Sequence, residues 1–203
     1  MILAFDVTER SALFSWTTPD GGKEREVLDG GKAAEFLVPT IHRIRGEQPL
    51  VALGVVRGPG SFTGIRVGLA TALGFKTALD IPVFGFSKFD LVAAHMGDRD
   101  FRLIMPSGRS EVMTADFQSG VLVSDPQIIP NESYQHQDGD VCIKTMENAP
   151  CEPLNIHLTD LVLDLMQAST PGETALEPLY IRPPDAKQGK TLVQKLIQKS
   201  GMA

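Results

Sequence analysis

The sequence predicts an α/β fold made of two halves that face each other across a cleft, with the second half reduced. The chain opens with three short alternating segments instead of a strand–helix–strand unit, and a nearly continuous apolar run follows at 50–56. Such a run is typical of a strand that is buried on both faces. Helical and strand-like segments then alternate up to residue 96, so the first half is predicted as βββαβαβα.

Residues 1–97 form the predicted first half. Its expected strands are 2–8, 12–18, 23–28, 50–56 and 81–86, and its expected helices are 31–45, 65–79 and 88–96. The helix at 31–45 has apolar residues on one face. Pro39 lies inside this segment and implies a kink or a late start, because proline cannot donate a helical hydrogen bond.

Residues 98–203 form the predicted second half, which is less regular. Its expected strands are 101–105, 111–117, 121–123 and 140–144, and its expected helices are 158–168 and 191–199. The helix at 158–168 has the clearest apolar face in the chain. Residues 177–184 are expected to be extended, because each proline restricts the residue before it.

The net charge, the two cysteines and the lengths of the apolar stretches limit the classes of function that the sequence allows. The net charge of −6 argues against unaided binding of nucleic acid, since phosphate contacts need clustered Lys and Arg. Cys142 and Cys151 fit neither a redox CxxC motif nor a zinc ribbon, and both are expected to be reduced thiols. The start of the chain lacks a signal-peptide pattern and no apolar stretch is long enough for a membrane span, so a cytoplasmic location is expected.

A glycine-rich loop between the buried strand and the next helix is the most informative segment. Glycines permit backbone angles closed to other residues, and a helix start attracts anions. The loop has neither the Gly-Lys-Ser/Thr ending of a Walker A motif nor the glycine spacing of a dinucleotide fingerprint. It is either a tight connection without a ligand or an anion or nucleotide site. The residues of this possible site are Asp6, Gly58, Gly60, Ser61, Thr63, Gly64 and Arg66.

The string GPGSFTGIR at 58–66, continued by VGLATALG at 67–74, resembles the signature of the TsaB (YeaZ) family. Residues 5–9 resemble the opening strand of that family, and residues 177–182 resemble its C-terminal ending. The resemblance is collinear over most of the chain and is weak between residues 98 and 175. The element order also recurs in the actin, Hsp70 and sugar-kinase superfamily, which by itself carries little functional weight.

The resemblance implies an actin-like fold and a non-catalytic subunit. Proteins of this family pair with a TsaD-like catalytic subunit, which a TsaE-like ATPase joins. The complex transfers threonylcarbamoyl from an adenylate to the adenosine beside the anticodon of tRNA. The resemblance therefore implies no catalytic residue and no metal ligand in this chain. It places ATP or ADP and the metal on the partner subunits, and it implies that tRNA is reached through the complex.

Two other function classes stay open. The first is an actin-like ATPase or small-molecule kinase, although Val7 and Thr8 follow Asp6 where glycine would admit a phosphate. A second Asp is also missing near Met105. The second class is a glycoprotease-like metallopeptidase, although the four histidines are too far apart in sequence to share a helical face.

The helix that follows the loop is the expected partner surface. One of its faces is made mostly of small residues, which would let another helix approach closely: Gly64, Gly68, Thr71, Ala72 and Phe75. The opposite positions are expected to pack on the sheet: Val67, Ala70, Leu73 and Thr77. The alternative is that the small residues let the helix lie tightly on its own sheet. An uncovered apolar face would also favour a homodimer when the chain is isolated.

Overall fold

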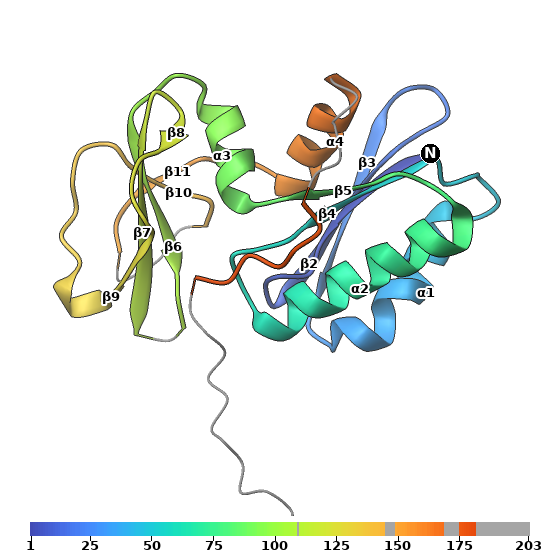
Figure 1. The fold of residues 1–203 in the computed structure, drawn as a ribbon, viewed down its shortest axis with the longest axis horizontal. Coiled ribbons are helices and arrows are strands. Elements are labelled where there is room, and N and C mark those ends of the chain that lie inside the picture. Colours follow the sequence, from blue (N-terminus) through green and yellow to red (C-terminus); the bar gives the residue numbers. More distant parts are fainter. Residues whose placement is uncertain (109, 145–148, 169–174, 182–203) are drawn as a thin grey trace, which may run out of the picture.

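The computed structural model describes residues 1–108, 110–144, 149–168 and 175–181. The predicted helix at 191–199 lies outside these residues. The described part contains two β-sheets with helices packed on and between them (Figure 1). None of its helices has the length and apolar character needed to cross a membrane.

The first sheet has five strands in the order β3-β2-β1-β4-β5. These strands are β1 (Ile2–Asp6), β2 (Ser11–Thr17), β3 (Lys23–Asp29), β4 (Ala52–Val56) and β5 (Val83–Phe86). The first three are antiparallel, and β4 and β5 run parallel to β1. All five residues of β4 are buried, as predicted for a strand covered on both faces.

Helices cover both faces of this sheet. Helices α1 (Ala33–Arg45) and α2 (Phe62–Leu79) lie on one face, where alternate residues such as Leu3 and Phe5 join their core. Helix α4 (Leu158–Ala168) lies on the other face and packs on β1, β2 and β4. Gly54 makes this approach possible, because a Cβ atom there would lie 2.3 Å from Val162 Cγ1.

The second sheet repeats the strand order of the first. Its strands are β6 (Phe101–Pro106), β7 (Glu111–Gln118), β8 (Val121–Leu122), β9 (Gln127–Pro130), β10 (Asp140–Cys142) and β11 (Glu152–Pro153). Strands β6 and β7 are antiparallel, β8 and β9 pair with the two ends of β7, and β10 and β11 run parallel to β6. The half is reduced: between β9 and β10 the chain forms only the 3-10 turn η1 (Asn131–Ser133).

Helices α3 and α4 each pack on the sheet of the other half of the chain. Helix α3 (Lys88–Met96) follows the first sheet in sequence, but its apolar residues Phe89 and Val92 pack on the second sheet. Its Leu91 faces the core beneath α4, so α3 lies between the sheets (Figure 1). Helix α4 follows the second sheet and covers the first. The division into subdomains 1–97 and 98–203 stays a prediction.

The prediction of two reduced thiols was wrong, because Cys142 and Cys151 form a disulfide. Cys142 ends β10, and Cys151 directly precedes β11, the parallel neighbour of β10. This pairing brings the two Cα atoms to 5.8 Å, which is within the ordinary range for a disulfide. The sequence spacing alone did not reveal the contact, because it depends on how two very short strands pair.

A buried ion pair holds the same region together. The Arg102 guanidinium donates two hydrogen bonds to the Asp140 carboxylate, at 2.6 and 2.7 Å, and the Asp140 side chain is fully buried. The Tyr134 hydroxyl and the Gln137 N–H also donate to Asp140. Burial alone would raise the pKa of Asp140, but these hydrogen bonds outweigh burial and hold it below its usual value. Burial and the neighbouring carboxylate raise the pKa of Tyr134 to about 12.

Candidate functional site

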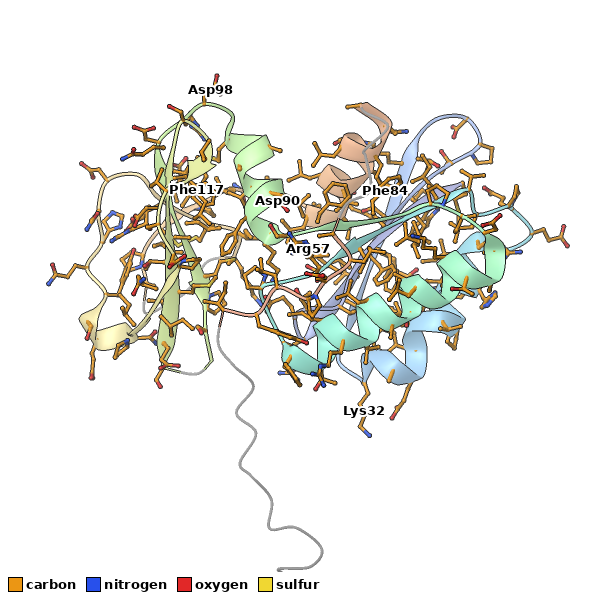
Figure 2. All side chains as sticks on the ribbon, in the orientation of Figure 1. Lys32, Arg57, Phe84, Asp90, Asp98 and Phe117 are labelled. Atoms are coloured by element: carbon orange, nitrogen blue, oxygen red, sulfur yellow. A yellow bond between two sulfur atoms is a disulfide. The ribbon has the colours of Figure 1, made fainter. Side chains whose placement is uncertain are left out.

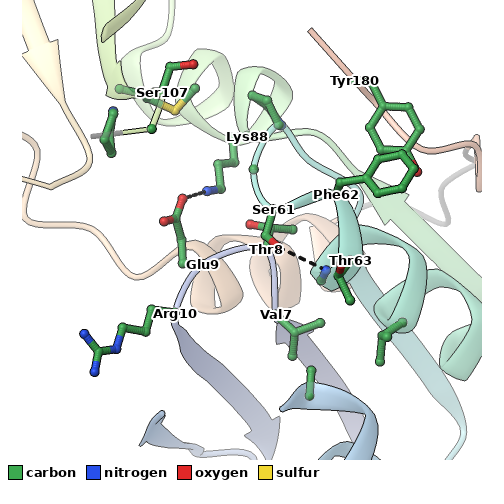
Figure 3. A pocket seen from close by; sticks show the side chains of 18 of the residues that line it. Val7, Thr8, Glu9, Arg10, Ser61, Phe62, Thr63, Lys88, Ser107 and Tyr180 are labelled. Atoms are coloured by element: carbon green, nitrogen blue, oxygen red, sulfur yellow. Dashed lines mark hydrogen bonds and ion pairs between the residues drawn. The ribbon is translucent and has the colours of Figure 1, made fainter. Parts of the chain in front are cut away.

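A cleft of about 840 Å³ lies between the two halves. Its walls come from the β1–β2 turn at 7–10, the start of α1, the glycine-rich loop at 59–64 and the β6–β7 turn at 105–108. Tyr180 and Lys88 also line the cleft (Figure 3). Four residues of the predicted anion or nucleotide site line this cleft: Gly60, Ser61, Thr63 and Gly64. Asp6, Gly58 and Arg66 do not line it.

Gly60 and Gly64 of the loop are explained by close packing on the β1–β2 turn, whereas a Cβ atom on Gly58 would lie 2.6 Å from the Leu179 carbonyl oxygen. A Cβ atom on Gly64 would lie 2.0 Å from the Val7 carbonyl oxygen, well inside van der Waals contact. The Ser61 N–H donates a 2.7 Å hydrogen bond to the Thr8 carbonyl oxygen. The loop and the first turn of α2 are thus docked directly on the turn that follows β1.

The N–H groups of Ser61, Gly64 and Ile65 donate hydrogen bonds within the protein. The Ser61 hydroxyl caps α2 by accepting from the Gly64 N–H at 3.3 Å, and the Ile65 N–H donates to the Ser61 carbonyl. Arg66 is turned outward, where its Nε donates to the Tyr180 hydroxyl at 3.1 Å. The anion site at this loop therefore stays a prediction, without Arg66 or the Ser61 N–H as donors to a ligand.

Asp6 braces the β1–β2 turn. Its Oδ1 accepts a 2.8 Å hydrogen bond from the Thr8 N–H, and the side chain is buried. Among the described residues, Asp6 Oδ2 and Thr8 Oγ1 are buried without a hydrogen-bond partner. The Thr8 contact therefore gives Asp6 a structural role in this turn.

An ion pair crosses the cleft. Lys88, at the start of α3, lies 2.5 Å from the Glu9 carboxylate of the β1–β2 turn, and only 4% of its side chain is exposed. Its backbone N–H donates to the Gly58 carbonyl oxygen. Sequence reasoning missed this pair, because the two residues are 79 positions apart and neither belongs to a motif.

That the chain by itself binds no nucleotide tightly stays a prediction. The turn after Asp6 has no glycine, and the loop donors described above are already engaged. Glu9 also places a carboxylate in the cleft, where it pairs with the Lys88 ammonium. In the described ranges, no three His, Cys, Asp or Glu side chains gather closely enough to hold a metal ion.

The segment at 175–181 runs across the end of the first sheet and reaches the cleft. The Leu179 N–H donates to the Arg57 carbonyl oxygen at 2.9 Å. The Tyr180 ring then packs on Phe62 with 4.9 Å between ring centroids, and the Arg66 guanidinium lies 4.0 Å from the Phe62 centroid on α2. This segment matches the C-terminal string that carries part of the family resemblance.

The predicted faces of α2 are reversed in the structure. Gly64, Gly68, Ala72 and Phe75 are buried, and Phe75 packs beside His42 of α1. The residues expected to pack on the sheet are instead exposed at Ala70, Leu73 and Thr77, with Val67 partly buried. The small residues let α2 lie tightly on its own sheet, which was the alternative interpretation. The partner role of α2 stays a prediction.

Comparisons with known proteins agree with this architecture. The family model of TsaD, described as tRNA N6-adenosine threonylcarbamoyltransferase, matches residues 46–133. An uncharacterized protein of Mycobacterium tuberculosis is 31% identical over 176 residues, which cover 81% of this chain and 82% of that protein. A Bacillus subtilis protein named tRNA threonylcarbamoyladenosine biosynthesis protein TsaB is 31% identical over 111 residues. That alignment covers 50% of this chain and 47% of the relative.

Among solved structures, YeaZ from Pseudomonas aeruginosa shares the fold. Its TM-score is 0.63 at 20% sequence identity, and the match covers 88% of this chain and 99% of YeaZ. This likeness and the repeated strand order confirm the predicted actin-like α/β fold with a reduced second half. Sequence relatives and fold agree on one assignment: the chain belongs to the TsaB (YeaZ) family.

Proposed function

We propose that this chain is a non-catalytic subunit in the biosynthesis of threonylcarbamoyladenosine in tRNA. It works in complex with a TsaD-like catalytic subunit and a TsaE-like ATPase. The observation that carries the proposal is the 31% identity to Bacillus subtilis TsaB over 111 residues. The glycine-rich string at 58–66 carries the family resemblance, and the packing of the loop and α2 on the β1–β2 turn requires Gly60 and Gly64.

The chain holds neither a nucleotide nor a metal tightly by itself, and ATP or ADP and the metal bind to the partner subunits. The missing glycine after Asp6 and the engaged N–H groups of Ser61 and Gly64 support this assignment. The complex works in the cytoplasm. It reaches tRNA through its other subunits, because a chain with a net charge of −6 repels phosphate.

Depletion of the protein is expected to lower threonylcarbamoyladenosine in bulk tRNA several-fold, as measured by mass spectrometry of digested tRNA. Re-expression of the wild-type chain should restore the level, and a TsaD-like protein should co-purify with it. An unchanged level in depleted cells that have no second copy of the gene would contradict the proposal.

The exposed side of α2 is the proposed surface for pairing with the TsaD-like subunit and, in isolation, with a second copy of the chain. Ala70 and Leu73 are exposed there, and a Cβ atom on Gly74 would meet no atom within 4 Å. Small side chains on an exposed helix face let another helix approach closely.

Ala70→Arg is therefore expected to weaken pairing at least tenfold without unfolding the chain, since it places a charge in an apolar contact. Isothermal titration with the TsaD-like subunit measures the affinity. Ala94→Arg is the matched control, because Ala94 is an exposed helical alanine on α3. Equal affinities of the two variants would place the pairing surface elsewhere.

A further inference from the structure

A second exposed apolar surface lies at β8, which pairs with the end of β7 that is remote from the cleft-lining Met113. Val121, Leu122 and Val123 are consecutive residues at β8, with 63%, 37% and 49% of their surface exposed. We call these three residues the β8 patch. It stands in the second sheet, well separated from α2, which packs on the first sheet (Figure 1).

Four exposed carboxylates surround the β8 patch. Asp116 lies beside it, because the Val123 N–H donates to the Asp116 carbonyl oxygen. Asp125 follows two residues later. Asp100 accepts from the Ser119 N–H at the tip of the β7–β8 hairpin, and Asp98 stands beside that tip, where Gly120 contacts Gly97. Figure 2 shows Asp98 at the end of the sheet, pointing outward.

Few cations balance these carboxylates. Arg102 stands opposite Asp116 in the β6–β7 pairing, but its guanidinium is held by Asp140. Arg99 donates to the Met96 sulfur. Among the described residues, no ion pair joins Asp98, Asp100, Asp116 or Asp125 to a lysine or arginine.

The charge of the whole chain is concentrated in this half. Residues 98–153 contain ten acidic and four basic residues, whereas residues 1–97 contain ten of each. The negative charge of the four carboxylates around the β8 patch repels the phosphates of nucleic acid. It also disfavours a second copy of the chain, which would bring the same carboxylates to the contact. Charge complementarity therefore favours a positively charged binding partner at the β8 patch.

We propose that the β8 patch binds a protein segment in which apolar side chains alternate with lysine or arginine. The apolar side chains would cover Val121 and Val123, and the cations would meet the surrounding carboxylates. Pro126 and Pro130 lie along the same edge and limit strand addition, so the contact is made mainly through side chains. This surface is separate from the α2 surface proposed for the TsaD-like subunit.

The test uses the full-length chain and a fluorescent peptide of alternating lysine and leucine, with an alternating glutamate and leucine peptide as the reversed-charge probe. Fluorescence anisotropy at low salt is expected to show binding of the basic peptide alone. Val121→Ser with Val123→Ser should weaken it at least tenfold, and so should Asp98→Asn with Asp125→Asn. Raising the salt to 0.5 M should also weaken it, because salt screens exposed charges.

Glu132→Gln with Glu152→Gln is the matched control. It removes two exposed carboxylates from the same half, in η1 and at the opposite edge strand β11. The control should bind the peptide as the wild-type chain does, and each variant should keep its unfolding midpoint. Equal losses in the control and in the patch variants would overturn the proposal, as would the absence of binding. Loss of a dimer in the Val121 and Val123 variant, measured by ultracentrifugation, would assign the patch to self-association instead.

Discussion

Gly64→Ala is expected to lower the free energy of unfolding by about 3 kcal/mol, the upper end of the usual cost of extra atoms in a well-packed core, or to prevent folding. The added methyl group would lie 2.0 Å from the Val7 carbonyl oxygen, so α2 would have to move off the β1–β2 turn. That movement would also break the hydrogen bond from Ser61 to Thr8.

Gly74→Ala is the matched control on the same helix. No atom lies within 4 Å of its added Cβ, so the better helix propensity of alanine should stabilise the chain by up to about 1 kcal/mol. Urea unfolding followed by the fluorescence of Trp16, the single tryptophan, measures both variants. Equal effects of the two substitutions would contradict the packing of the loop on the turn.

Asp140→Ala is expected to lower the free energy of unfolding by about 3–5 kcal/mol, the usual result of removing one partner of a buried ion pair. The Arg102 guanidinium, whose side chain is 17% exposed, would lose its carboxylate, and the Tyr134 hydroxyl would lose an acceptor. Asp164→Ala is the control. Asp164 pairs with Lys23 but is 54% exposed, so its loss should change stability by less than about 1 kcal/mol.

The same pair gives a pH dependence with a definite sign. The pKa of Asp140 is lowered in the folded chain, so its contribution to stability is complete above the pKa of the unfolded state, about 3.9. The contribution is lost as the pH falls through the lower pKa of the folded state. Unfolding free energies between pH 7 and pH 3 should therefore fall more steeply for the wild-type chain than for Asp140→Asn. Parallel curves would contradict the assignment.

The sequence predicted the first half well because its signals are local. The apolar run at β4, the glycine-rich loop and the start of α2 lie in one stretch, and the loop residues carry the family resemblance. The orientation of α2 was wrong because glycine and alanine suit both a tight approach to the chain's own sheet and a contact with another helix. The pattern of small residues does not distinguish the two.

The second half was less predictable because its order is set by distant contacts. Strands β8 and β11 have two residues each, too few for any periodicity to identify them. The Cys142–Cys151 disulfide and the Glu9–Lys88 ion pair both join segments that become neighbours only when the sheets assemble. The apolar stripe of α4 predicted a buried face but not which sheet would cover it.

The position of α4 also bears on how the chain folds during synthesis. When residues 1–97 have left the ribosome, β1 to β5 can pair and α1 and α2 can cover one face of their sheet. The other face, with Ala4, Gly54 and Val56, stays uncovered until α4 has been made. The nascent chain thus carries an apolar surface through the synthesis of the whole second sheet, and such surfaces are where partly folded chains aggregate. Completion of the first half therefore depends on α4, the last helix described here.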